Sequence, residues 1–263
     1  MTTTELLRTA WATEPAVPLM SVALVLGYAT HFRGRISRRA LSFVAAALLF
    51  FLALSSPIGV LARGYLFSAH MLQHLLLTLV IPPLVLLGLP PDLDEHPAAS
   101  APRPTLLPWV AGVGAMWIWH AKPLCNAAAT HGSIQVVQTA SLIAMGLAFW
   151  RPVLGPRRAE RMTPLKAVPY LFSACVACTI LGVIVTLSPV EVCTAYMHPV
   201  DELGVLPLLR QGWGLDCKAD QELGGLLMWV PTCFVYAGAI LATLGKYFGE
   251  EARPAAADAR GAR

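Results

Sequence analysis

The stretch FSAHMLQHLLLTLVIPPLVLLGLP, residues 67–90, places His70, Gln73 and His74 at the head of a long run of leucine, valine and isoleucine. A bilayer crossing takes about 20 apolar residues, so this run is long enough to span a membrane as a helix. Ionisable side chains are costly in lipid, and within membrane spans they face the interior of the bundle and mark functional sites. The stretch therefore predicts a membrane helix that carries a polar site.

The whole chain has membrane character. Hydrophobic residues make up 56% of its 263 residues and charged residues 13%, and the mean hydropathy is +0.62. A soluble domain carries about 25% charged residues. We expect an all-α integral membrane protein with seven transmembrane helices in one domain over 1–263, at roughly 16–32, 40–58, 66–89, 105–120, 132–150, 165–187 and 221–246. An outer loop is expected at about 188–219 and a disordered tail at about 250–263.

The basic residues predict how the bundle is oriented. Fourteen Lys and Arg residues fall in 33–39, at 103, in 151–166 and in the tail from Lys246, and five fall in the alternate segments. By the positive-inside rule the N-terminus is outside and the C-terminus is cytoplasmic. The first residues, MTTTELLRTAWATEP, lack the basic start of a cleavable signal peptide. This pattern is typical of a multi-pass protein of a bacterial plasma (inner) membrane, and its basic loop anchors do not suggest nucleic acid as a partner.

The orientation places the two histidines at the outer side. Their spacing of four residues puts His70 and His74 on one helix face, one turn apart. At 1.5 Å per residue they lie roughly 8 Å and 14 Å below the outer start of the third span.

Further donor side chains reach the same depth from other spans. The fourth span ends in MWIWH, which puts His120 at the outer boundary with Met116 one turn beneath it, and the fifth begins at His131. The seventh span begins DQELGGLLMW, with Asp220 at its mouth and Met228 roughly 12 Å along it. Four spans thus bring polar and sulfur ligands to the outer third of the bundle.

Imidazole and thioether together favour copper, especially Cu(I). The predicted metal residues are His70, His74, His120, His131, Met228 and Asp220. Simpler interpretations stay open: wet interfacial positions for His120 and His131, packing for the methionines, and hydrogen bonds from the paired histidines to Gln73, Gln135 or Gln138. His31 and His96 lie in or near cytoplasmic segments, and we interpret both as solvated.

These motifs resemble the multi-span CtaG family of cytochrome c oxidase assembly factors, the type found with caa-type oxidases. The resemblance runs from about residue 16 to 246 and rests on the stretch 67–90, the WIWH ending, FWRPV at 149–153 and DQELGGLLMWVP at 220–231. It implies a seven-helix protein that helps to deliver copper to a metal centre of the oxidase, with an oxidase subunit and an outer-compartment copper donor as partners. The matching positions are His70, His74, His120, His131, Asp220, Met228 and Trp229. Many members carry a second histidine soon after the one that matches His131. This chain has glutamines there, so Cys125 or Met71 is a possible substitute.

The six cysteines divide between loops and spans. Cys193 and Cys217 bracket the outer loop, and the oxidising outer compartment permits a disulfide between them, which would stabilise the loop by roughly 3 kcal/mol. Cys125 lies in the predicted metal mouth, as a thiolate ligand or as an inert thiol. Cys175 and Cys178 form a CxxC at mid-membrane, either as small packing residues or as a transfer path for copper.

Pro82 and Pro83 should kink the third span and free the carbonyls of Thr78 and Leu79. No serine or cysteine is visibly paired with a base, so we expect no enzyme. The sequence predicts a membrane copper-binding assembly factor. The alternatives are a b-type haem or quinone protein, since histidines on separate helices also suit haem, and a copper transporter.

Overall fold

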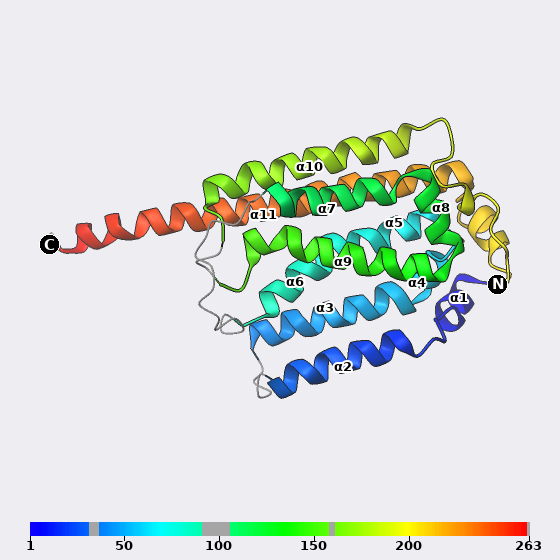
Figure 1. Cartoon of the computed structure of the whole chain (residues 1–263), viewed down its shortest axis with the longest axis horizontal. Coiled ribbons are helices and arrows are strands. Elements are labelled where there is room, and N and C mark those ends of the chain that lie inside the picture. The colour runs from blue at the N-terminus through cyan, green and yellow to red at the C-terminus, as the bar shows by residue number, and fades with distance from the viewer. Residues whose placement is uncertain (32–36, 91–105, 158–160, 262–263) are drawn as a thin grey trace.

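Long apolar helices run side by side in one bundle in the computed structural model, which describes residues 1–31, 37–90, 106–157 and 161–261, with side chains up to 249 (Figure 1). All regular elements among these residues are helical. The seven segments expected to be helices correspond to α2 (Ala16–His31), α3 (Arg38–Ser55), the run Phe67–Gly88, α7 (Leu106–Trp119), α9 (Gly132–Leu154), α10 (Pro164–Leu187) and α11 (Cys217–Gly261). By length and composition five of them can cross a membrane, whereas α2 and α7 are shorter apolar helices. A seven-span count and the orientation remain predictions.

Three short helices were not predicted, and they lie outside the long apolar runs. They are α1 (Thr3–Thr9), α4 (Pro57–Leu61) and α8 (Lys122–Thr130). α1 begins with a capping box, in which Thr2 and Glu5 satisfy each other's backbone N–H groups. α1 and α8 lie with the 188–216 loop at one end of the bundle, which we call the loop end (Figure 1). At the other end α11 projects beyond the bundle, and its backbone continues as helix to Gly261, through the segment for which the composition predicts disorder.

The run Phe67–Gly88 consists of α5 (Phe67–Leu75), the π-helical turn η1 (Leu76–Val80) and α6 (Ile81–Gly88). The prolines were expected to kink this span, and the structure has a π-helical turn directly before Pro82 and Pro83, which lie at the start of α6. Proline has no N–H to donate, so carbonyls one turn earlier lose their helical partner. The carbonyl of Thr78 instead accepts a hydrogen bond of 3.1 Å from Nε1 of Trp150 on α9.

Two glycines let α11 lie close to both α5 and α10. A Cβ added at Gly224 would lie 2.5 Å from Cδ1 of Phe67, and one at Gly225 would lie 2.6 Å from the backbone N of Thr186. Any larger residue at these positions would push the helices apart. The close approach places the first turns of α11 directly against the start of α5.

Candidate metal centre

His70 and His74 lie on one face of α5, inside the bundle. Their exposed fractions are 1% and 2%, and their ring centroids are 4.3 Å apart. None of their four ring nitrogens has a hydrogen-bond partner of ordinary geometry within the described part of the chain. Gln73, a proposed partner, instead donates to the carbonyl of Ala53 at 2.8 Å, and Gln138 lies beside His74 with its own Nε2 unpaired. An unsatisfied buried polar group costs about 1–3 kcal/mol. The looser contacts of His74 with Gln138 and of His70 with the backbone of Ala62 do not satisfy the ring nitrogens.

His120 joins this pair from the end of α7. It is buried, and its ring lies perpendicular to that of His74 with centroids 5.4 Å apart. Its Nδ1 lies 2.6 Å from the carbonyl oxygen of Met116, and its Nε2 lies 3.1 Å from Sδ of Met71. A proton on Nδ1, donated to the carbonyl, leaves Nε2 with a free lone pair that faces a sulfur. An imidazole nitrogen of His120 and the thioether sulfur of Met71 thus face each other.

Three thioethers lie near the histidines inside the bundle. Met71, Met116 and Met228 belong to one buried cluster, which also contains Phe67 and Tyr196. Met116 and Met228 were expected here. Met71 was considered only as a substitute ligand, because it follows His70 and so points about 100° away around the helix. His120 lies next to Met71 because of where α7 packs in the bundle.

Asp220 is buried, but both of its oxygens are already used. Oδ2 accepts from the N–H of Phe67 at 2.7 Å, and Oδ1 accepts from the N–H of Ser68 at 3.0 Å and from its hydroxyl at 2.5 Å. The preceding residue, Leu66, offers no side-chain cap. The carboxylate of α11 therefore caps α5, where the helix dipole also favours negative charge.

His131 lies apart from the other predicted ligands. It is exposed, at the residue before α9, and its Nδ1 lies 2.8 Å from the hydroxyl of its neighbour Thr130. Of the predicted set, the structure thus brings together His70, His74, His120 and Met228, with Asp220 as the cap of α5 and His131 outside the cluster.

The predicted Cys193–Cys217 disulfide is wrong. Cys193 is bonded to Cys125, with Cα atoms 5.8 Å apart, and Cys217 is a free thiol. The reason is α8, which presents Cys125 to the turn η4 (Thr194–Tyr196) of the outer loop. The next residue of α8, Asn126, accepts a hydrogen bond from the N–H of Ala195 at 2.8 Å. Cys125 is therefore neither a thiolate ligand nor a free thiol in this structure.

Tyr196 closes the histidine cluster at the loop end, and no sequence pattern pointed to it. Its side chain is fully buried, with its ring 5.6 Å from that of His70, and its hydroxyl donates to the carbonyl of Ala62 at 2.9 Å. Burial raises the pKa of this hydroxyl well above its ordinary value, so it stays a neutral donor. Arg210 holds the turn in place by donating to the Tyr196 carbonyl at 3.1 Å.

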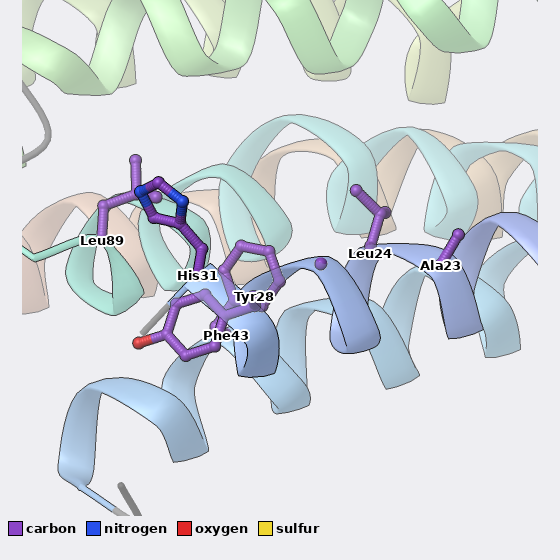
Figure 2. A pocket seen from close by; sticks show the side chains of 7 residues that line it. Ala23, Leu24, Tyr28, His31, Phe43 and Leu89 are labelled. Carbon is purple, nitrogen blue, oxygen red and sulfur yellow. The ribbon is translucent and has the colours of Figure 1, made fainter. Parts of the chain in front are cut away.

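No three His, Cys, Asp or Glu side chains of the described residues are already arranged about one point as metal ligands. The candidate centre is thus a group of imidazoles and thioethers that lie near one another without the arrangement of a formed metal site. A groove of about 390 Å³ lies between α2, α3 and the end of α6, and it is lined mainly by apolar side chains and His31 (Figure 2). We do not assign it to the metal centre. His96 lies outside the described residues.

Comparison with known proteins supports the resemblance. No curated protein and no solved structure matches the chain at a significant level. The model of the cytochrome c oxidase caa3 assembly factor family, Caa3_CtaG, matches residues 22–248. The matched residues include the three clustered histidines and all three thioethers. The chain therefore belongs to the Caa3_CtaG family of cytochrome c oxidase caa3 assembly factors.

Proposed function

We propose that this assembly factor binds copper as Cu(I) between α5, α7 and α11 and delivers it to a subunit of cytochrome c oxidase. The observation that carries the proposal is the set of unpaired ring nitrogens on His70 and His74, beside a third histidine whose Nε2 faces a thioether. Soft thioethers select Cu(I), and imidazole is also a copper ligand.

The charge of the site favours a monovalent ion. The proposed donors are neutral imidazoles and thioethers, and the nearby carboxylate of Asp220 is engaged as the cap of α5. A neutral donor set leaves the whole charge of the ion uncompensated inside the membrane, where charge is expensive. A divalent ion would cost more than Cu(I).

We further propose that the loop end faces the outer compartment, as the basic residues predict. Copper would then arrive from a donor outside the cytoplasm and leave for the oxidase on the same side. In the closed arrangement Tyr196 lies over His70, so exchange requires the η4 turn to move. The proposal assigns no catalytic reaction to the chain.

The test is the copper content of purified protein after loading with Cu(I), scored beside membrane abundance and host oxidase activity. His70→Ala, His74→Leu and His120→Ala should each abolish binding at this site, whereas Met228→Leu should weaken it only in part. His74→Leu is the sharpest variant. It removes a buried polar group that has no partner, so the protein should stay at least as stable while it loses copper.

Two variants serve as comparisons. His31→Ala removes an imidazole at the opposite end of the bundle and should leave copper content unchanged. His131→Ala should do the same, because His131 is exposed and apart from the cluster. Normal copper in the His70 and His74 variants, at normal abundance, would contradict the proposal, and any role in oxidase assembly would then act through protein contacts alone.

A further inference from the structure

Three of the four free cysteines in the described residues lie along the seam between α10 and α11. Sγ of Cys175 on α10 lies 3.5 Å from Sγ of Cys233 on α11, without a bond between them. The hydroxyl of Thr179 lies 3.3 Å from the Cys233 sulfur. Cys178, the second cysteine of the CxxC, is buried one turn from Cys175 on the same helix. The CxxC motif lies within α10, whereas the sulfur–sulfur contact in the structure joins α10 to α11.

A small cavity lies between Cys178 of this seam and Met116 of the proposed copper centre. Its volume of about 20 Å³ is close to that needed for one water molecule. Met116, whose carbonyl holds His120, and Cys178 both line it. On α11, Cys233 lies about 7.5 Å further from the loop end than Met228, at 1.5 Å per residue. Sulfur donors therefore continue inward from the thioethers.

We propose that Cys175 and Cys233 form a second soft-metal site that takes Cu(I), with Cys178 as a third sulfur on the cavity side. Metal–sulfur bonds of about 2.3 Å at a tetrahedral angle place two sulfurs about 3.8 Å apart, so the two sulfurs would move apart by roughly 0.3 Å from their observed separation. Hard cations prefer oxygen ligands, and Thr179 supplies a single hydroxyl. The site therefore selects a soft ion.

Binding replaces protons by the metal ion. Both thiols lose their protons to solvent and bind Cu(I) as thiolates, because the thiolate is the form of cysteine that ligates metals. Two protons leave and one Cu(I) enters, so the occupied site carries a single negative charge, to which the hydroxyl of Thr179 beside Cys233 can donate. This site goes beyond the proposed function and stands independently of the histidines.

The test uses the full chain in detergent, loaded without oxygen and titrated against a colorimetric Cu(I) chelator. The double variant Cys175→Ser/Cys233→Ser should bind one copper fewer than the parent, and His74→Leu should also bind one fewer. Cys217→Ser removes the remaining free thiol, at the loop end, and should bind as the parent does. X-ray absorption of copper bound to the His74→Leu protein should show sulfur ligands without nitrogen.

Two results would overturn the second site. One is unchanged copper binding in the double variant, with a normal melting temperature and membrane abundance. The other is a Cys175–Cys233 disulfide in peptide maps of protein purified without oxygen. Because serine places a hydroxyl in the bilayer, Cys175→Ala/Cys233→Ala is measured beside it as a second variant. If His74→Leu keeps all its copper while the thiol variants lose one equivalent, the histidine proposal fails and the thiol site remains.

Discussion

The ring of His120 is oriented by contacts on both of its nitrogens. The carbonyl of Met116 holds Nδ1, and Nε2 is left facing Met71. Partners of this kind fix the tautomer and the direction of a metal-binding histidine. His70 and His74 have no partner of ordinary hydrogen-bond geometry in the described residues, so no hydrogen bond of this kind fixes their tautomers. His120 is therefore oriented by its neighbours before any metal binds, whereas His70 and His74 are not oriented in this way.

At the same scale, Asp220 gives a prediction about stability. Asp220→Ala leaves the N–H groups of Phe67 and Ser68 without their acceptor, which should lower the free energy of unfolding by about 1–3 kcal/mol. Asp220→Asn should cost less, because its amide oxygen still accepts a hydrogen bond while the favourable charge at the helix start is lost. Thermal unfolding in detergent measures both.

Glu222→Ala is the matched control for Asp220. Its carboxylate is on the same helix, but it is partly exposed and pairs with Lys218 at 3.7 Å. Exposed ion pairs contribute about 0–1 kcal/mol, so this variant should melt close to the parent. Equal melting temperatures for the Asp220 and Glu222 variants would show that the cap does not stabilise α5.

At the scale of elements, α8 determines how the outer loop is held. Cys125 and Asn126 are neighbours on α8, and both bind the 193–195 segment, one through the disulfide and the other through its side-chain oxygen. The same segment leads into Tyr196, which covers His70. α8 thus anchors the residue that closes the candidate centre.

The disulfide can be tested by alkylation. Without reductant, Cys125 and Cys193 should resist labelling and appear as one linked pair of peptides, whereas Cys217 should be labelled. Cys193→Ser should then lower stability by roughly 4 kcal/mol on the chain-entropy model, given a separation of 68 residues. Recovery of a Cys193–Cys217 peptide pair would restore the pairing expected from the sequence and exclude the arrangement at α8.

At the scale of the molecule, the outward faces of the bundle are apolar. Leu19, Leu107, Leu187 and Phe234 have exposed fractions of 65% to 76%, which suits lipid and not water. Basic residues lie at both ends of the bundle. Arg38 begins α3 at the end away from the loops, and Lys122 begins α8 at the loop end.

Topology is the prediction that belongs to this scale. With the N-terminus outside and the C-terminus inside, a reporter that is active only in the cytoplasm should be active when fused after Arg263 and inactive when inserted in the exposed loop after Leu203. The opposite pattern would place the histidines and the loop end on the cytoplasmic side, and with it the proposed exchange with the oxidase.

The positions of the long helices and the inward histidine pair were predictable, because apolar runs and i, i+4 spacing act within one segment of chain. The prolines predicted a kink, but not that the helix before them would take a π-helical turn. The family followed from the same motifs. The partners of individual side chains were not predictable. Asp220 accepts hydrogen bonds from the start of α5, Cys193 forms a disulfide with Cys125, and His131 lies outside the cluster. These outcomes depend on how far each helix slides and turns against its neighbours, and that is decided by contacts such as Gly225 against Thr186, between residues that lie far apart in the chain.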